Sequence, residues 1–329
     1  MKKSILILMA TFNGQKYLRE QLDSIMKQVG VEVHLLVRDD GSQDDTLDIL
    51  NEFNLIYHNI TILKAPVNGR HGPMSNYYEL IKVAKETYSK KYDYFAFSDQ
   101  DDIWKKNKLV TLLSFFKDES KPELVYADYS VIDANGEVTL KSANDSMGLS
   151  IRNPVEVLLT NSYAWGHSIL FNKELLIEIA INNTVVESNF PHDVYFAKFA
   201  ALCDGIYFCP EQLVNYRRYS TNVSGMWYKL SLTTIFKRVN LIKESKIYAN
   251  VVNSTLMVIN ENKKCKFINN DLISLYFSII DTVGIKTVLS LKKNSICRKQ
   301  RSRDINMKLI YSLGIYKKWI GKNKKMVDL

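Results

Sequence analysis

Three carboxylates occur within four residues, directly after an apolar, strand-like run that ends at Ser98. They are Asp99, Asp101 and Asp102. Carboxylates this close repel one another, and at the end of a buried strand they are partly removed from water, so a positive partner is expected. A divalent cation held by oxygen ligands is the simplest such partner. Taken in isolation the residues favour an Asp-rich structural turn, and only their surroundings favour a metal site.

The spacing of the acids does not fit the calcium loop of an EF-hand. Counted from Asp99, the sixth position is Trp104, where such a loop needs Gly, and the twelfth is Val110, where it needs Glu. A different kind of oxygen-rich site is therefore expected.

Polar residues also follow two earlier strand-like segments. Residues 4–10 are apolar and residues 31–38 form a second strand, and helical periodicity follows each of them. Alternating strands and helices predict a parallel sheet with crossover helices, in which ligands bind beyond the carboxyl ends of the strands. The polar residues at the three ends are Thr11 and Asn13, Asp39 and Asp40, and Asp99 and Asp101. Because these ends meet at one edge of a parallel sheet, we expect the side chains to lie together.

The rest of the chain continues this pattern and then changes. Further strands are predicted at 60–63, 94–98, 124–129, 168–171, 206–208 and 214–219. An apolar helix from Val194 to Leu202 begins directly after His192 and Asp193. From about residue 229 the pattern becomes that of amphipathic helices rich in Lys and Arg. We therefore predict an α/β domain over residues 1–228 and a basic helical region over residues 229–329.

The net charge of +9 is distributed unevenly. Residues 1–228 contain 23 Lys/Arg and 29 Asp/Glu, whereas residues 229–329 contain 21 and 6. The C-terminal region is therefore expected to meet an anionic partner, such as the headgroups of an inner membrane leaflet. A packing or oligomerisation module with a solvated basic face is the alternative. A nucleic-acid partner is not expected, because no recognised binding motif accompanies the charge.

Cysteine usage and the N-terminal residues bear on location. Cys203, Cys209, Cys265 and Cys297 have no metal-ligand spacing and are interpreted as reduced and buried. Residues 1–10 superficially resemble a signal peptide, but the apolar run is short and no convincing cleavage site follows, so a first β-strand is the better interpretation. No apolar stretch approaches the length of a membrane span. We expect a cytoplasmic protein that is peripheral on the inner face of the plasma membrane.

Four motifs, in their order and spacing, closely resemble those of the family 2 glycosyltransferases, which are inverting enzymes of the GT-A fold. They are Met9-Ala10-Thr11-Phe12-Asn13-Gly14, Arg38-Asp39-Asp40-Gly41-Ser42, Ser98-Asp99-Gln100-Asp101-Asp102-Ile103-Trp104 and His192-Asp193. With Phe-Asn at 171–172 and Tyr-Arg at 216–217, the chain is most similar to the bacterial rhamnosyltransferase-like branch, which builds cell-surface polysaccharides. The resemblance covers about residues 4–225 and implies a GT-A fold, with a mostly parallel sheet flanked by helices.

The resemblance implies a metal-assisted departure of a nucleotide diphosphate. A metal bridging two phosphate oxygens stabilises the leaving group as a Lewis acid. Mg²⁺ or Mn²⁺ suits carboxylate, water and phosphate oxygens and takes one or two protein carboxylates. Asp101 is the best candidate for a direct ligand, and Asp99 for a contact to the ribose or to a metal-bound water. For Asp102 a helix N-cap is at least as good an interpretation.

Other residues are expected to hold the nucleotide-sugar by the same resemblance. Asp40 matches the position that reads a pyrimidine base through its imide N–H. Backbone groups around Ala10 complete the base pocket, although the family usually has Pro there. The remaining donor-binding candidates are Thr11, Phe12, Asn13, Arg70, Asn76, Gln100 and Arg217. Exposed-loop roles for Asp40 and Arg70 are the alternatives.

Inverting transfer also needs a base for the acceptor hydroxyl. Asp193 is the candidate, since the helix it opens would hold its charge, and a capping Asp is the alternative. His192 orients Asp193, touches the acceptor or is a packed structural His. Trp104, Trp165 and the adjacent Gly166 are candidates for the acceptor site, with core aromatics as the alternative for both tryptophans.

These expectations combine into a metal-dependent inverting glycosyltransferase. The donor is a dTDP- or UDP-sugar, with dTDP-L-rhamnose favoured, and the acceptor is a growing surface glycan, of capsule, O-antigen or rhamnan type, on a lipid carrier. A sugar nucleotidylyltransferase would need a Gly-rich, basic loop where Thr11 to Gln15 stand. A non-catalytic nucleotide-sugar-binding subunit of a polysaccharide assembly is a further alternative.

Overall fold

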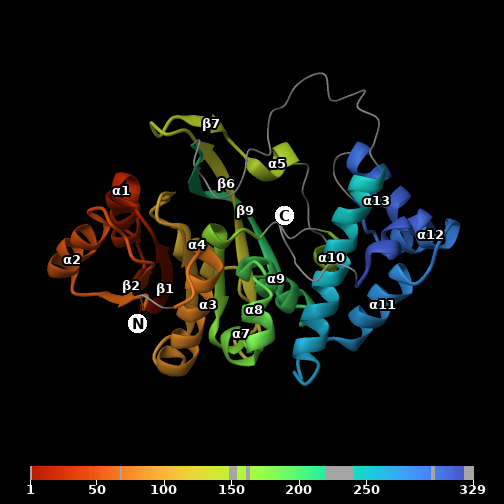
Figure 1. The fold of residues 1–329 in the computed structure, drawn as a ribbon, viewed down its shortest axis with the longest axis horizontal. Coiled ribbons are helices and arrows are strands. Elements are labelled where there is room, and N and C mark those ends of the chain that lie inside the picture. The colour runs from red at the N-terminus through yellow and green to blue at the C-terminus, as the bar shows by residue number, and fades with distance from the viewer. Residues whose placement is uncertain are drawn as a thin grey trace.

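The computed structural model describes residues 2–66, 69–147, 154–160, 164–219, 241–297 and 301–321. A twisted sheet runs through the α/β part, and the C-terminal helices form a layer on one side of it (Figure 1). The predicted α/β class is confirmed. The predicted boundary at residues 228 and 229 lies outside the described residues.

The first half of the sheet is parallel, as predicted. Its strands are β1 (Lys3–Thr11), β2 (Val31–Asp39), β3 (Ile60–Lys64) and β4 (Tyr94–Ser98), in the spatial order β3-β2-β1-β4. Helices α1 (Gln15–Met26), α2 (Thr46–Tyr57) and α3 (Pro73–Val83) make the crossovers, and a π-helical turn (Ala84–Tyr88) extends α3. Thr11 pairs with Asp39, and Met9 pairs with Ser98. The three polar strand ends therefore meet at one edge.

The second half of the sheet is mixed. Its strands are β5 (Ile103–Trp104), β6 (Leu124–Ile132), β7 (Val138–Leu140), β8 (Ile169–Asn172) and β9 (Ile206–Arg217). β8 is antiparallel to both β4 and β6, while β6 is parallel to β9. The two strands predicted at 206–208 and 214–219 are one strand, β9, whose pairing with β6 shifts register around Asp128. β9 also pairs with β5 and so reaches back to residues 99–102, which we call the acidic loop.

Short helices connect these strands and cover the sheet. They are α4 (Lys108–Leu113), α5 (Ala143–Met147), α6 (Pro154–Leu159), the 3₁₀ turn η2 (Gly166–Ser168), α7 (Lys173–Glu178), α8 (Asn183–Glu187) and α9 (His192–Leu202). Helix α9 is buried on nearly every side, which explains its almost uniformly apolar sequence after Asp193. Its N-terminal residue His192 stacks on Tyr77 of α3.

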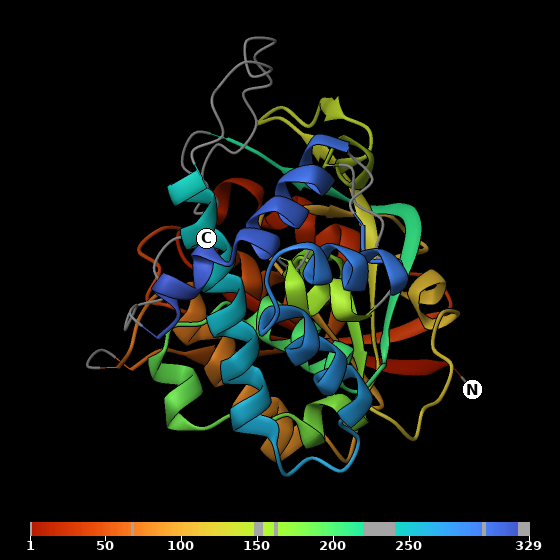
Figure 2. The same ribbon diagram turned by 90° about the vertical axis from the view of Figure 1, so that its right-hand side faces the viewer.

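The C-terminal layer consists of α10 (Leu241–Asn262), α11 (Asn270–Ile280), α12 (Ile285–Lys293), α13 (Arg301–Leu313) and the 3₁₀ turn η4 (Ile315–Trp319). These helices lie in front of the α/β part in Figure 2. They share one hydrophobic cluster with α6 and α9. Tyr311 donates to the carbonyl of Leu159 at 2.6 Å, and Asn262 donates to the hydroxyl of Tyr195 at 2.9 Å. Within the described residues no helix is both long enough and apolar enough to cross a membrane.

Candidate active site

The ends of β1 and β2 are joined by the turn that carries Asp39 and Asp40. Thr11 Oγ1 donates to Asp39 Oδ2 at 2.9 Å, and the backbone N–H groups of Gly41 and Ser42 donate to Asp39 Oδ1 at 3.1 and 2.9 Å. These bonds fold the turn, so Asp39 has a structural role. They leave Asp40 at the rim of the edge.

The buried carboxylate of Asp40 is held by the loop before α3. Oδ2 accepts the N–H of Gly72 at 2.7 Å, and Oδ1 lies 2.9 Å from His71 Nδ1. The guanidinium of Arg38 is 3.7 Å from Oδ1 and also donates to Asn76 Oδ1. The predicted base reader therefore contacts positive or donating groups from two elements. Asn76 is another predicted donor-binding residue, and the guanidinium of Arg38 links it to Asp40.

Gln100 ties the acidic loop to the loop after β1. Its Oε1 accepts the Phe12 N–H at 2.9 Å, and its Nε2 donates to the Phe12 carbonyl at 3.1 Å. A Cβ at Gly14 would overlap the side-chain amide of Gln100, so a larger residue there would push Gln100 out of its bonds to Phe12. Asn13, with φ of +46°, accepts the Gln43 N–H at 2.9 Å. Residues 10–13 and Gln100 are thus one connected wall, on which the ring of Phe12 is exposed.

The three acids after β4 occupy different environments. Asp99 accepts the Tyr77 hydroxyl at 2.8 Å, and Asp101 accepts the Tyr219 hydroxyl at 2.5 Å. Burial and the neighbouring Asp101 raise the pKa of Asp99 to about 7, and burial raises that of Asp101. Asp102 is fully buried, and its Oδ1 accepts the Arg217 N–H at 3.0 Å. Burial raises the pKa of Asp102 well above its ordinary value.

Two buried basic side chains brace this acidic loop. Lys108 Nζ donates to the carbonyl of His167 at 2.6 Å and lies 3.1 Å from the centre of the Trp104 ring, and burial lowers its pKa well below the ordinary value. Arg217 is 1% exposed; it donates from Nε to the Asp101 carbonyl at 3.0 Å and pairs with Glu20 at 2.5 Å. Its guanidinium therefore positions the acidic loop.

The acidic loop fits a cation that takes few protein ligands. Within the described part of the chain, no three His, Cys, Asp or Glu side chains gather as a closed metal cage. Asp102 Oδ2 is buried and has no hydrogen-bond partner there. The available donors are carboxylate oxygens whose negative charge is disfavoured by burial, which a bound Mg²⁺ or Mn²⁺ would relieve. The residues present therefore fit such an ion, with water and phosphate completing its coordination.

Asp193 lies in the first turn of α9 and faces the 3₁₀ turn η2. Its Oδ2 accepts the Gly166 N–H at 3.1 Å, and its Oδ1 accepts the Val194 N–H at 2.8 Å. Burial raises its pKa to about 6. A Cβ at Gly166 would lie 3.1 Å from His192 Nε2, so a side chain here would require the His192 ring to shift by a few tenths of an ångström.

Tyr77 of α3 connects the two sides of the site, and sequence reasoning missed it. Its hydroxyl lies 2.8 Å from Asp99 Oδ1, and its ring stacks on His192 with 3.8 Å between centroids. His192 is 5% exposed, and neither ring nitrogen has a partner within the described residues. Burial lowers its pKa to about 3, so the ring is neutral. An aromatic residue at a helical apolar position gives no sequence signal beyond core packing.

The start of α3 and the glycine before it contact Asp40 and Asp99 directly, and reach Asp193 only through its neighbour His192. Gly72 binds Asp40, Asn76 binds Arg38, and Tyr77 reaches Asp99 and the residue next to Asp193. The charge of Asp193 also acts on Asp99, since it contributes to the raised pKa of that group. The predicted convergence of acids from separate segments on one edge is present.

Three further predicted residues lie in different settings, and one of them, Trp104, lies away from the expected binding surface. Trp104 is 3% exposed and is a core aromatic under Lys108, so it offers no face to a sugar ring. Trp165 is 36% exposed and stands next to Gly166, so its ring is accessible to an acceptor sugar. Arg70 is exposed and pairs with Glu187 of α8 at 3.1 Å.

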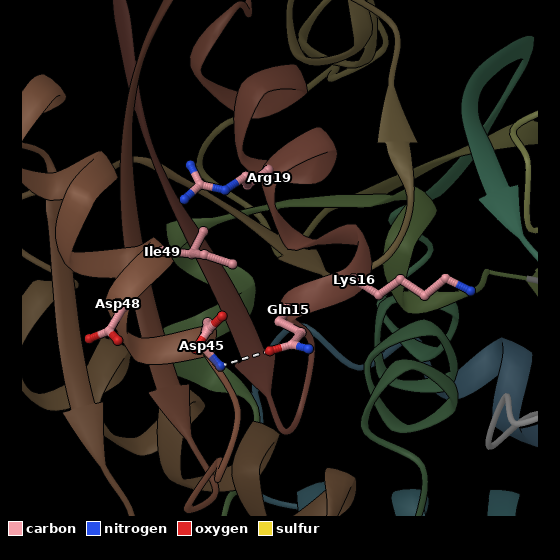
Figure 3. Close-up of a pocket in the computed structure, with 6 residues that line it drawn as sticks. All are labelled: Gln15, Lys16, Arg19, Asp45, Asp48 and Ile49. Carbon is pink, nitrogen blue, oxygen red and sulfur yellow. Dashed lines mark hydrogen bonds between the residues drawn. The ribbon is translucent and has the colours of Figure 1, made fainter.

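A separate surface hollow lies between α1 and α2 (Figure 3). It is lined by Gln15, Lys16, Arg19, Asp45, Asp48 and Ile49. None of the predicted site residues lines it, and Arg19 is already paired with Glu52 at 2.6 Å. We assign no ligand to this hollow.

Comparison with known proteins gives a consistent result. Residues 6–180 match the family model for glycosyl transferase family 2. The chain is 28% identical over 270 residues to the dTDP-rhamnosyl transferase RfbG of Shigella flexneri, an alignment covering 80% of this chain and 88% of that protein. It is 23% identical to the glycosyltransferase GlyG of Streptococcus pneumoniae, covering 70% and 76%. The crystal structure of TarS from S. aureus superposes with a TM-score of 0.51 at 17% identity, over 94% of this chain and 55% of that one.

Proposed function

Because this chain belongs to glycosyl transferase family 2, and is therefore a glycosyltransferase of the GT-A fold, we propose that its activity depends on a divalent metal and inverts the configuration at the anomeric carbon of the transferred sugar. The donor is a nucleotide-diphospho-sugar, and dTDP-L-rhamnose is the first to test. The similarity to a dTDP-rhamnosyl transferase supports that choice. The acceptor is a growing cell-surface polysaccharide on a lipid carrier.

The donor lies along the wall formed by the ends of β1 and β2. Asp40 accepts the imide N–H of the pyrimidine, in exchange for one of its bonds to the loop at Gly72. Backbone groups of residues 10–13 line the base and ribose, and Gln100 keeps that wall in place. Arg70, at the exposed end of the same loop, is free to leave its solvent-exposed pair with Glu187 for the diphosphate.

The diphosphate lies against the acidic loop. Asp101 is the proposed direct metal ligand, and Asp99 contacts the ribose or a metal-bound water. The bound Mg²⁺ or Mn²⁺ would stabilise the charge of the departing nucleotide diphosphate. Tyr77 and Tyr219 donate hydrogen bonds to the two carboxylates and so fix their orientation before binding. Arg217 holds the backbone of the same loop.

Asp193 is the proposed general base on the other side of the sugar. The backbone N–H groups of Gly166 and Val194 hold its carboxylate at the start of α9. With a pKa of about 6 it is ionised at neutral pH and is still basic enough to take the proton of an acceptor hydroxyl. His192 has two unpartnered ring nitrogens beside it, which supports a contact from His192 to the acceptor. Trp165 and Gly166 complete this side.

The observation that carries the proposal is that the Tyr77–His192 stack links the acidic loop to α9: Tyr77 is bonded to Asp99, and His192 directly precedes Asp193. Purified wild-type protein, Asp101→Ala and Asp193→Asn should be compared in transfer assays and in thermal-shift assays with nucleotide-sugars and Mn²⁺. A ligand that binds only the folded state raises its stability, so the true donor stands out. We expect Asp101→Ala to lose the Mn²⁺-dependent stabilisation, and Asp193→Asn to keep it but lose transfer. Full transfer activity in both variants would refute these roles.

The same assays separate the remaining alternatives. A non-catalytic nucleotide-sugar-binding subunit would show Mn²⁺-dependent stabilisation without turnover of any donor. The C-terminal third, with its excess of 21 Lys/Arg over 6 Asp/Glu, supports a position on an anionic inner leaflet, beside a lipid-linked acceptor. Self-association of the chain remains an outcome to be measured by light scattering.

A further inference from the structure

The outward faces of α12 and α13 carry large apolar side chains. The five residues are Ile285, Leu289, Ile305, Leu309 and Leu313, with 75%, 58%, 56%, 39% and 48% of their surfaces exposed. They recur at intervals of four along each helix, while Leu291, Met307 and Ile310 face the core. We call these five side chains the apolar ridge. Soluble surfaces rarely expose such contiguous apolar rows.

The two rows of the ridge belong to neighbouring helices. The N–H of Gly284, before α12, donates to the carbonyl of Ser312, near the end of α13, at 2.7 Å. A Cβ on Gly314 would lie 2.8 Å from Cγ1 of Val283, which is itself 55% exposed. The start of α12 therefore meets the end of α13. Both helices belong to the layer nearest the viewer in Figure 2.

Basic residues surround the ridge. Residues 283–321 contain ten Lys/Arg and one acidic residue, Asp304. On α12, exposed Lys286, Lys292 and Lys293 flank Ile285 and Leu289. None of these three lysines forms an ion pair within the described residues, whereas Lys308 of α13 pairs with Asp304 at 2.5 Å. The combination is an apolar strip with three exposed lysines on its α12 side that form no ion pair within the described residues.

A second exposed apolar patch gives a contrast. Leu55, Ile56 and Tyr57 at the end of α2 are 76%, 62% and 40% exposed. The exposed charged residues of that helix are acidic, Asp48 and Glu52. That patch therefore lacks the positive flanks that favour an anionic surface.

We propose that the apolar ridge inserts into the interface of an anionic bilayer, with Lys286, Lys292 and Lys293 on the headgroups. An interfacial helix buries its apolar face at the boundary of headgroups and acyl chains, and basic flanks add attraction to anionic lipids. The ridge supplies both features on one face. This inference rests on the proposed function for its lipid-linked acceptor, and it names the surface that brings the enzyme to it.

Vesicle sedimentation tests the ridge without donor, metal or acceptor. Phosphatidylcholine vesicles, alone or mixed with phosphatidylglycerol, are incubated with wild-type protein and with the double variant Leu289→Glu, Leu309→Glu. We expect wild-type protein to bind the anionic vesicles and the variant to lose about tenfold in bound fraction. The matched control is Leu55→Glu, Ile56→Glu on α2, which makes the same change at exposed positions and should bind like wild type.

A milder variant keeps the test valid if the double variant folds poorly. Ile285→Ser changes the most exposed ridge residue, and thermal melting reports its fold. Lys292→Glu, Lys293→Glu should weaken binding to anionic vesicles and remove most of its salt dependence. Equal binding of wild type to neutral and anionic vesicles, or equal binding of ridge variants and wild type, overturns the proposal. A wild-type dimer in light scattering that Leu289→Glu dissociates also overturns it, because a second copy would then cover the ridge. None of these results bears on the transferase assignment.

Discussion

The acidic edge consists of Asp99, Asp101, Asp102 and Asp193. It differs from the C-terminal layer of α10 to α13 in how its buried polar groups affect stability. At the edge, burial raises the pKa of every carboxyl, so ionised side chains there oppose folding. In the layer, buried polar groups such as the Tyr311 hydroxyl and Asn262 are hydrogen-bonded to α6 and α9. The edge is arranged for ligands and the layer for stability. Function and stability therefore depend on different parts of the molecule, and α9 contributes to both.

The largest expected effect comes from the edge. Asp193→Asn keeps the size and the hydrogen-bond acceptor of the side chain but removes its basicity. We expect kcat to fall by about 10²–10⁴-fold, because general-base help contributes that much. Donor binding, measured by thermal shift, should be unchanged. Asp271→Asn, at the same kind of first-turn position in α11, is the matched control and should keep full activity. Loss of activity in both variants would show that the assay reports on folding.

The pH dependence should report the same carboxyl. With a pKa of about 6, Asp193 is protonated below pH 6 and then cannot accept a proton, so kcat/KM should fall about tenfold per unit on the acid side. The folded pKa lies above the ordinary value, so the folded state binds the proton more tightly. The contribution of Asp193 to wild-type stability therefore falls as pH rises from about 4 to 6 and is level above that range.

Thermal melts across this pH range provide a second check. Asp193→Asn lacks the titrating group, so it should gain stability relative to wild type between pH 4 and 6. A wild-type rate without an acid limb near pH 6 would contradict the role of Asp193 as base.

A smaller effect is expected at Tyr77. Tyr77→Phe keeps the ring stack on His192 but removes the hydroxyl 2.8 Å from Asp99. A hydrogen bond to a charged group contributes about 1.5 kcal/mol or more, so the Mn²⁺ concentration for half-maximal donor binding should rise about tenfold. The maximal rate at saturating Mn²⁺ should change less. Tyr57→Phe, on the exposed end of α2, is the matched control. An equal fall in rate at every Mn²⁺ concentration would indicate that Tyr77 acts elsewhere.

Sequence reasoning predicted the acidic edge better than the layer, for a physical reason. The residues at the ends of β1, β2 and β4 had to meet, because parallel strands align their carboxyl ends. The burial of Trp104 and the bracing role of Arg217 both depend on β9 returning beside β5, where Trp104 pairs with Val214. Such contacts between distant segments have no local signal. Tyr77 was missed for the same reason.

In the C-terminal layer the sequence showed charge but not packing. Its excess of Lys and Arg predicted a separate basic module, and the helical character is confirmed. The sequence did not reveal that Val252 and Tyr311 join the same cluster as α9, since that depends on which helix faces pack. Lys198 illustrates the point. It is a charged residue within an apolar helix, and in the structure it is buried and donates to the Val157 and Leu158 carbonyls and to Thr255.

The smallest effect tests whether the layer supports the edge. Tyr311→Phe removes a buried hydroxyl and leaves the Leu159 carbonyl at the end of α6 without that donor. We expect the free energy of unfolding to fall by about 1–3 kcal/mol, measured by urea denaturation. The rate at 25 °C should be unchanged, because the hydroxyl touches α6 and no residue of the acidic edge. Tyr57→Phe serves again as control and should lie within about 0.5 kcal/mol of wild type. If Tyr311→Phe instead lowers kcat without lowering stability, the layer positions catalytic groups through α6 and α9, and the division between a stabilising part and a reactive part is wrong.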